Sequence, residues 1–410
     1  MVELPGRGVA LEVDIHRCSA APGSSRDRAA GRAGAGPAAA ATAATAAVDG
    51  RPVLVVLHPW AWLGGCMDDH VVVSVCRAAI SSRHFSCVVR YNMRGAGQSG
   101  GSRAFFPSAD ADDLEALVQH LLPGTGAQQQ LQPPPPQQQQ QPAMGASGLT
   151  APGAEGAGEP QQRLGQRPRL AVVAYSYGGV VAGRALAALR PHLAALALIG
   201  FPMGKLCRIF LGSGPAWEAL SGSGSAATAA TVAGLPRLAC CGAYDQFTDV
   251  RQLTAAVDKA NRRSAAAPGS RGPGPAAGAA ACASDSPGSA DADASGAIQL
   301  AIWPGCDHFF GSCLDPEALA ASGLVPPAEL PEDDEDGAAR GGGAAAGGQG
   351  PLSAGYTASW LATRRPAVPL AEYVVRWLGR VCAGPQAAAA GAGAVKGALV
   401  GVRGGVGGAG

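Results

Sequence analysis

The chain has 410 residues, and its 31 basic and 30 acidic side chains give a net charge of +1. This balance supplies no basic field for nucleic acid, so we expect no nucleic-acid partner. The 11 Cys form no CxxC pair, which favours reduced thiols in a cytoplasmic protein and predicts neither a disulfide framework nor a metal site.

The N-terminal region predicts a strand at residues 9–16 followed by a low-complexity insertion. No apolar run reaches the roughly 18 residues that a membrane span needs, and no basic segment precedes an apolar core. We therefore expect no membrane span and no secretory signal. The Arg- and Ala-rich stretch at 26–32 resembles an organelle transit peptide, but its place after a plausible strand favours an insertion in a hairpin.

Short β-branched runs then alternate with helical patterns along the chain. The predicted strands are 53–57, 86–91, 170–175, 193–200, 235–242 and 298–305, and the predicted helices are 68–82, 110–122, 178–189, 249–260 and 370–381. Such alternation implies right-handed crossovers and a mostly parallel sheet with helices on both faces, an α/β fold. Ligands of such sheets bind beyond the carboxyl ends of the strands.

Gly, Pro, Ala and Gln are concentrated in blocks that cannot bury enough apolar surface to offset the entropy of ordering them. We expect low-complexity insertions at 19–48, 124–167, 222–234, 264–296 and 331–350, and a disordered Gly/Ala-rich tail at 383–410. Roughly 200 to 230 residues of periodic sequence remain, which suit a single domain over 1–382 better than two.

This single-domain interpretation predicts that deleting residues 128–165 changes the melting temperature little. The segment should lie outside the core, between a helix and the strand at 170–175, and the cost of closing a loop rises only slowly with its length. Thermal unfolding of the full and shortened chains measures the effect. A loss of several kcal/mol would mean that the tract packs against the domain.

The candidate nucleophile is Ser176, in Ala174-Tyr175-Ser176-Tyr177-Gly178, between a predicted strand and a predicted helix. Small residues two before and two after a serine permit the strained turn of a nucleophile elbow, here with Ala in place of the usual first Gly. The pentapeptide alone is weak evidence in so Ala- and Gly-rich a chain, and a helix N-cap is the alternative.

Chain order selects the candidate base, since hydrolases with this elbow carry Ser, acid and His in that order. Only His308, after the strand at 298–305, lies beyond every candidate acid. Asp245 follows the strand at 235–242 and is the candidate acid. Asp249 as a helix cap and Asp307 as a surface residue are the alternatives for this role.

The backbone N–H of Tyr177, next to the serine, is one expected oxyanion-hole donor. The second should come from the loop after the strand at 53–57. Pro59 has no N–H, so Trp60 is the candidate, while His58 is expected to be a packing residue.

Together with HPWAWLGGCMDDHVV, RYNMRGAGQSGG and PGCDHFF, these segments resemble a small, essentially lid-less branch of the α/β-hydrolase superfamily, akin to dienelactone-hydrolase-like and serine-aminopeptidase-like proteins. The resemblance implies a triad of Ser176, Asp245 and His308, and a loop at 94–99 bordering the site. No cofactor is implied.

The expected function is hydrolysis of a small ester, thioester or related acyl substrate through an acyl-enzyme intermediate. Apolar residues between the strands at 193–200 and 235–242 predict an open, apolar-rimmed cleft: Phe201, Met203, Phe210 and Trp217. The alternatives are a serine peptidase and a catalytically idle scaffold whose Gln/Pro tracts serve protein interaction.

Overall fold

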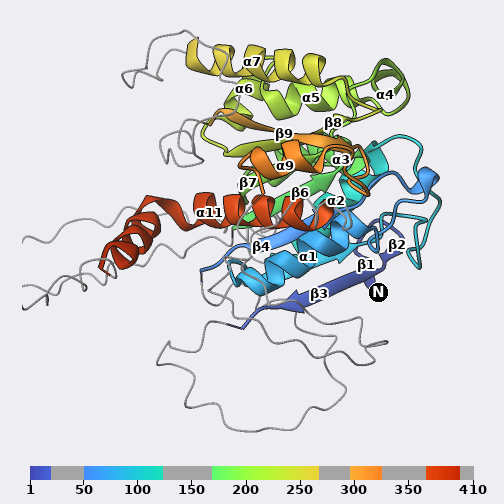
Figure 1. Ribbon diagram of the computed structural model, residues 1–410. Coiled ribbons are helices and arrows are strands. Elements are labelled where there is room, and N and C mark those ends of the chain that lie inside the picture. Colours follow the sequence, from blue (N-terminus) through green and yellow to red (C-terminus); the bar gives the residue numbers. More distant parts are fainter. Residues whose placement is uncertain (20–49, 123–168, 267–295, 326–365, 398–410) are drawn as a thin grey trace, which may run out of the picture.

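The computed structural model describes residues 1–19, 50–122, 169–266, 296–325 and 366–397, with side chains up to residue 383. A seven-stranded sheet runs through the centre in the order β3-β5-β4-β6-β7-β8-β9 (Figure 1). Only β3 is antiparallel to its neighbour, β5, and the other pairs are parallel. A separate hairpin pairs β1 with β2. This mostly parallel sheet between helices confirms the predicted fold class.

The described strands are β1 Val2–Leu4, β2 Val9–Leu11, β3 Val13–Arg17, β4 Val53–Leu57, β5 Cys87–Tyr91, β6 Leu170–Tyr175, β7 Leu193–Ile199, β8 Arg237–Tyr244 and β9 Ile298–Asp307. The described helices are α1 His70–Ser82, α2 Ser108–Leu121, α3 Tyr177–Leu189, α4 Lys205–Phe210, α5 Ser213–Ser221, α6 Ala226–Val232, α7 Val250–Ala266, α9 Pro316–Ala321 and α11 Ala367–Gly397, with a short 3-10 turn at Ala61–Leu63.

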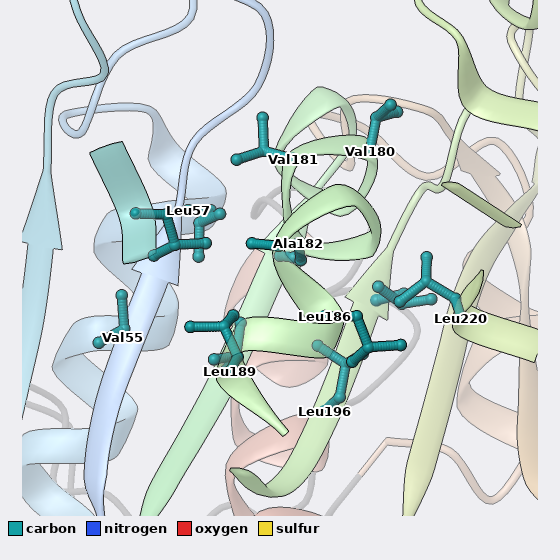
Figure 2. Packing of buried hydrophobic residues seen from close by; sticks show 14 of the residues in the cluster. Val55, Leu57, Val180, Val181, Ala182, Leu186, Leu189, Leu196 and Leu220 are labelled. Atoms are coloured by element: carbon teal, nitrogen blue, oxygen red, sulfur yellow. The ribbon is translucent and has the colours of Figure 1, made fainter. Parts of the chain in front are cut away.

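Two hydrophobic clusters cover the two faces of the sheet. In β4, Val55 and Leu57 belong to the cluster that α2, α3, α5 and α7 cover, and Figure 2 shows them facing Leu189 and Ala182 of α3. Leu54 belongs to the other cluster, under α1, α9 and α11. Successive strand side chains point to opposite faces, and here both faces are buried, which explains the uninterrupted apolar runs in the sequence.

Two strands replace the single strand predicted at 9–16. Val9–Leu11 pairs with β1, whereas Val13–Arg17 crosses to the edge of the main sheet beside β5. The edge strand β3 is only partly buried, so it carries polar residues such as Asp14 and His16. The other predicted strands and helices lie where expected, with ends that differ by a few residues, apart from the longer α7 and α11.

The expectation of a disordered insertion at 222–234 is wrong, because helix α6 lies within it. Ser225 caps the helix and exchanges hydrogen bonds with Thr228 in a capping box, and the side chain of Val232 is buried in the core. The Arg190 guanidinium donates to the carbonyl of Thr231 near the helix end. Alanine favours helix once caps and one apolar anchor are present, so composition alone was misleading.

The tail expected at 383–410 also differs, since α11 continues to Gly397 rather than ending near residue 381. Alanine has the highest helix propensity of any residue type. The many alanines of this segment account for the extension. The expected insertions at 20–48, 124–167, 267–295 and 331–350, and the end of the tail at 398–410, lie outside the described residues.

Candidate active site

Ser176 occupies a sharp turn between strand β6 and helix α3. Its backbone has φ 53° and ψ −119°, in the region that non-glycine residues avoid. Two hydrogen bonds hold this conformation: the Ser176 N–H donates to the carbonyl of Ile199 over 2.8 Å, and the Gly179 N–H donates to the Ser176 carbonyl over 2.9 Å. Ser176 is therefore no ordinary helix cap, and its side chain makes no capping bond.

Close packing explains the small residues around the turn. A Cβ atom at Gly178 would lie 2.7 Å from the Leu57 Cβ, and one at Gly179 would lie 2.8 Å from the Phe201 ring. Ala174 is fully buried in strand β6, and its methyl group fits the position where the elbow pattern usually has Gly. The requirement is steric, so alanine is compatible with the turn.

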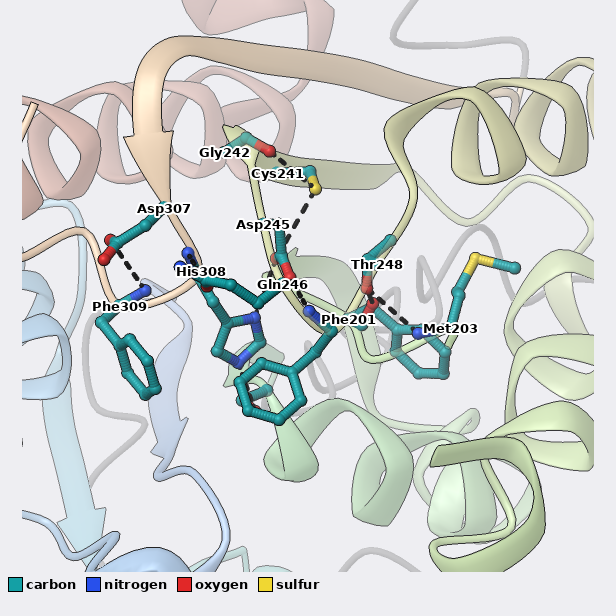
Figure 3. Close-up of polar contacts among 12 residues, drawn as sticks. Phe201, Met203, Cys241, Gly242, Asp245, Gln246, Thr248, Asp307, His308 and Phe309 are labelled. Carbon is teal, nitrogen blue, oxygen red and sulfur yellow. Dashed lines mark hydrogen bonds and ion pairs between the residues drawn. The ribbon is translucent and has the colours of Figure 1, made fainter. Parts of the chain in front are cut away.

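His308 lies between Asp245, beside it in Figure 3, and Ser176. The His308 Nε2 is 2.8 Å from the Ser176 Oγ, and the His308 Nδ1 is 2.8 Å from the Asp245 Oδ2. Since Nδ1 faces a carboxylate, it carries the proton and donates, which leaves Nε2 free to accept from the serine hydroxyl. The structure thus brings together the three residues predicted for the triad.

The His308 ring and the Asp245 carboxylate are both fixed by neighbours. The Phe247 N–H donates to the Asp245 Oδ1 over 2.8 Å, and the Phe247 ring lies 4.6 Å from the imidazole, centroid to centroid. The Tyr175 ring stacks on the imidazole at 5.9 Å, and its hydroxyl donates to the His308 carbonyl. The Asp245 side chain is fully buried and the His308 side chain is 3 % exposed.

The two alternative acids have local roles. The Asp249 Oδ1 accepts from the N–H of Arg251 over 2.8 Å and so caps helix α7. The Asp307 Oδ1 accepts from the Phe309 N–H over 3.1 Å in an exposed turn. Both contacts agree with the cap and surface interpretations of these residues.

Trp60 and Tyr177, the two residues predicted to supply the oxyanion-hole N–H groups, both lie close to Ser176. Tyr177 is the first residue of α3, where the N–H groups have no partner within the helix. Trp60 lines the same cleft as Ser176, its ring centroid is 6.2 Å from that of Tyr177, and its carbonyl accepts from Leu63 and Gly65 in the turn that follows. A Cβ atom at Gly65 would collide with the Pro59 carbonyl, so glycine is required for this tight turn.

Ser176 and His308 open into a cleft of about 600 Å³. Its walls are mostly apolar, and Lys205 and Asp69 are the charged side chains among the described lining residues. The apolar members are Pro59, Trp60, Leu63, Phe105, Pro202, Leu206, Phe210, Leu211, Phe247 and Phe309. Helix α4 forms one wall and the loop after β4 forms another. A cleft of this size and lining suits an acyl group of small-molecule dimensions.

The expected apolar rim is confirmed at one of its four residues. Phe210 lines the cleft and is 50 % exposed. Phe201, Met203 and Trp217 are instead buried in the core. The segment from 205 to 232 forms three short helices. Trp217 belongs to one of them, α5, and faces inward against Phe201, so that it and Met203 join the core rather than the cleft mouth.

His58 is a packing residue, as predicted. It is fully buried, its Nε2 accepts from the Met93 N–H over 2.9 Å, and its Nδ1 lies 2.6 Å from the Pro59 carbonyl. Burial lowers the pKa of His58 to about 4. The neutral ring therefore ties together the loops that follow β4 and β5.

The loop at 94–99 does not line the cleft around Ser176. Arg94 forms two hydrogen bonds to Asp113 of α2, over 2.7 and 2.6 Å, and the Ser99 hydroxyl donates to the Asn92 carbonyl. The expectation that this loop borders the site is therefore corrected: its polar groups anchor it to α2 and to the end of β5.

Two residues at the site were missed by sequence reasoning. Gly200 has φ 56°, a conformation that favours glycine, and a Cβ atom there would also make a tight contact with the imidazole, 3.1 Å from the His308 Cε1. The Cys241 Sγ is 3.7 Å from the Asp245 Oδ2 and supplies a weak donor. The only sequence signal for Gly200 was a glycine directly after a strand, and no sequence signal pointed to Cys241.

Asp110 of α2 binds Tyr177, the residue that follows Ser176 in the turn. Its Oδ2 accepts from the Tyr177 hydroxyl over 2.9 Å, and its side chain lies in the core. Burial raises the pKa of Asp110 to about 6, and the hydrogen bond from Tyr177 opposes this rise.

This pKa predicts a specific pH dependence of stability. The folded chain keeps the Asp110 proton up to about pH 6, whereas the unfolded chain releases it near the ordinary value of 3.8, so this group weakens the fold as the pH rises between them. The stability of Asp110→Asn relative to the wild type should therefore increase by roughly 2 kcal/mol between pH 4 and pH 7. Urea unfolding at both pH values measures this. The control is Asp112→Asn on the same helix, where the side chain is 57 % exposed and no such gain is expected.

Within the described residues, no group of three or more His, Cys, Asp or Glu side chains could hold a metal ion. No helix in the described part of the chain is long and apolar enough to cross a membrane.

No protein-family model and no curated protein sequence matches the chain. Several solved structures are similar to it. A homologue of α/β serine hydrolases from Coxiella burnetii is 14% identical and matches over 73% of this chain and 84% of that chain, with a TM-score of 0.37. An α/β serine hydrolase without a lid from Xanthomonas campestris is 19% identical over 63% and 72% of the two chains, with a TM-score of 0.34.

A third structure holds ferulic acid bound to Est1E from Butyrivibrio proteoclasticus; it is 11% identical over 75% of this chain and 91% of that chain, with a TM-score of 0.40. The assignment of the α/β-hydrolase fold itself rests on this chain's own sheet order and on the strand–Ser176–helix turn.

Proposed function

We propose that this chain is a serine hydrolase that cleaves a small ester, thioester or related acyl compound through a covalent acyl-enzyme. The observation that carries the proposal is the continuous line of contacts from the Ser176 Oγ to the His308 Nε2 and from the His308 Nδ1 to the Asp245 Oδ2, each 2.8 Å long. A serine, a histidine and an aspartate in contact at a strained turn beside a cleft are not needed to stabilise a fold. Catalysis accounts for their arrangement.

In the proposed reaction the Ser176 Oγ attacks the carbonyl carbon while the His308 Nε2 takes the hydroxyl proton. Asp245 keeps the imidazole in the required tautomer and stabilises the imidazolium. The N–H groups of Tyr177 and Trp60 are the proposed donors to the developing oxyanion. The imidazolium then protonates the leaving alcohol or thiol, and a water molecule, activated by the same base, releases the acid.

The lining of the cleft supports an apolar acyl or alcohol group. Trp60 and Phe105 stack edge to face at 5.5 Å on one side, and Leu206 and Phe210 of α4 face the cleft from another. Apolar walls bind hydrocarbon through burial of its surface, which amounts to about 0.8 kcal/mol for each CH₂ group removed from water. Lys205 is the one cation in the lining and offers a contact for a polar or anionic end.

The test is labelling of the purified chain with a fluorophosphonate probe, followed by turnover of p-nitrophenyl esters from acetate to dodecanoate and of a matched anilide. We expect labelling at Ser176 and faster turnover of esters than of the anilide. Faster turnover of the anilide would indicate the peptidase alternative. A chain that neither reacts with the probe nor cleaves any ester would be the idle scaffold, and the proposal would fail.

A further inference from the structure

Two cysteines face each other at the base of the segment that carries His308. Strand β9 ends at Asp307, and the chain then turns back so that Cys306 and Cys313 form an antiparallel bridge. The Leu314 N–H donates to the Gly305 carbonyl over 2.7 Å, one residue outside the pair. This pattern makes Cys306 and Cys313 a non-hydrogen-bonded pair, in which the two Cα atoms are about 4.5 Å apart and the side chains are closest.

That spacing suits a covalent link, since disulfides join Cα atoms about 4.4 to 6.8 Å apart. The two side chains are close enough to interact: burial, and after it the neighbouring Cys313 thiol, raises the pKa of Cys306. The Cys313 Sγ also lies 3.6 Å from the Pro304 carbonyl. Cys306 is fully buried, whereas Cys313 is half-buried and within reach of a small molecule.

The segment between the two cysteines contains the His308 imidazole and a wall of the cleft. Phe309 lines the cleft, and its carbonyl lies 2.7 Å from the His70 Nε2 of α1. Phe310 is buried with φ 51°. A bond between Cys306 and Cys313 would close an eight-residue ring around these groups without moving its ends.

We propose that Cys306 and Cys313 form a reversible disulfide bond with each other. The oxidant is a low-molecular-weight disulfide such as oxidised glutathione. The accessible Cys313 thiolate attacks the oxidant and forms a mixed disulfide, which releases one thiol. The Cys306 thiolate then attacks the Cys313 sulfur and releases the second. One external disulfide is reduced to two thiols, and two protein thiols are oxidised to one disulfide. This inference does not depend on the proposed function.

Another neighbouring pair of cysteines provides a matched control. Cys18 lies one residue beyond the Arg17–Cys87 register of β3 and β5. Cys87 belongs to the core cluster on one face of the sheet, whereas Cys18 packs against the cluster on the other face. The backbones of these two residues are close, but their side chains point to opposite faces of the sheet. The two thiols should therefore not form a disulfide bond.

The experiment incubates the full chain with oxidised or reduced glutathione, alkylates the remaining thiols and maps the peptides by mass spectrometry. With oxidised glutathione we expect a Cys306–Cys313 cross-link two hydrogens lighter than the dithiol, slower amide exchange at residues 307–312, and a melting temperature higher by about 5 °C. Reduced glutathione should reverse all three changes. Cys18→Ser should leave them unaltered.

Cys313→Ser should abolish the three changes, and it is the preferred variant because its side chain is partly exposed, whereas Cys306→Ser alters the core. Full alkylation of both cysteines after treatment with oxidised glutathione would overturn the proposal. A mixed glutathione disulfide that persists at Cys313 in the wild-type chain would also overturn it, since Cys306 would then be out of reach.

Discussion

Ser176→Ala is expected to abolish fluorophosphonate labelling and to lower kcat for ester hydrolysis by about 10⁵ to 10⁶-fold. The lost group is the Oγ that hydrogen-bonds with the His308 Nε2, and no described residue other than Ser176 offers a hydroxyl to that nitrogen. Active-site titration with the probe and initial rates measure both effects. Ser74→Ala, on helix α1 and outside the cleft lining, is the control and should retain labelling and rate.

The fold should survive this change, because Ser176 contributes little buried volume. Its positive φ even predicts that Ser176→Gly is more stable than Ser176→Ala by about 1 kcal/mol, since glycine has no Cβ to strain the turn. Urea unfolding of the two variants measures the difference. Labelling that persists in either variant would place the nucleophile elsewhere, and equal stability of the two would contradict the strained turn.

Asp245→Asn is expected to cut kcat by roughly 10³ to 10⁴-fold. An amide in place of the carboxylate presents an N–H or a weaker acceptor to the His308 Nδ1, so the imidazole loses the tautomer that leaves Nε2 free to accept. Steady-state kinetics on the best ester of the screen measure the loss. Asp245 is buried, so circular dichroism and a melting curve should accompany the rates and show a folded chain.

Two neighbouring aspartates are matched controls for this variant. Asp249→Asn removes a cap of α7, and Asp307→Asn removes a contact in an exposed turn, so each should cost about 1 kcal/mol of stability or less and leave kcat nearly unchanged. The double variant of Ser176→Ala with Asp245→Asn should be barely slower than Ser176→Ala alone, because the three groups act as a unit. A crippling effect of Asp249→Asn or Asp307→Asn would refute the choice of acid.

The sequence by itself determined the order of the parallel strands and of the main helices between them, and three of the residues that meet at the site. Uninterrupted apolar runs such as Val53–Leu57 and Leu170–Tyr175 occur because both faces of the sheet are buried, so local pattern and tertiary environment agree. The positions of Ser176, Asp245 and His308 followed from a rule of connectivity: residues directly after parallel strands meet at one edge of the sheet. That rule needs no knowledge of packing.

Only the tertiary structure decided features that depend on contacts between distant segments. Composition predicted no helix at Ala226–Val232, yet its end packs Val232 into the core and receives a hydrogen bond from Arg190. Glycine is favoured at position 200 by its positive φ and by the tight approach of the His308 ring, more than a hundred residues away. Burial of Met203 and of Trp217, which belongs to α5, likewise depends on how the short helices between β7 and β8 pack against the core. The hydrophobic pattern of a segment shows which of its side chains face the core. Which side chains of distant segments contact one another is decided only when the whole chain packs together.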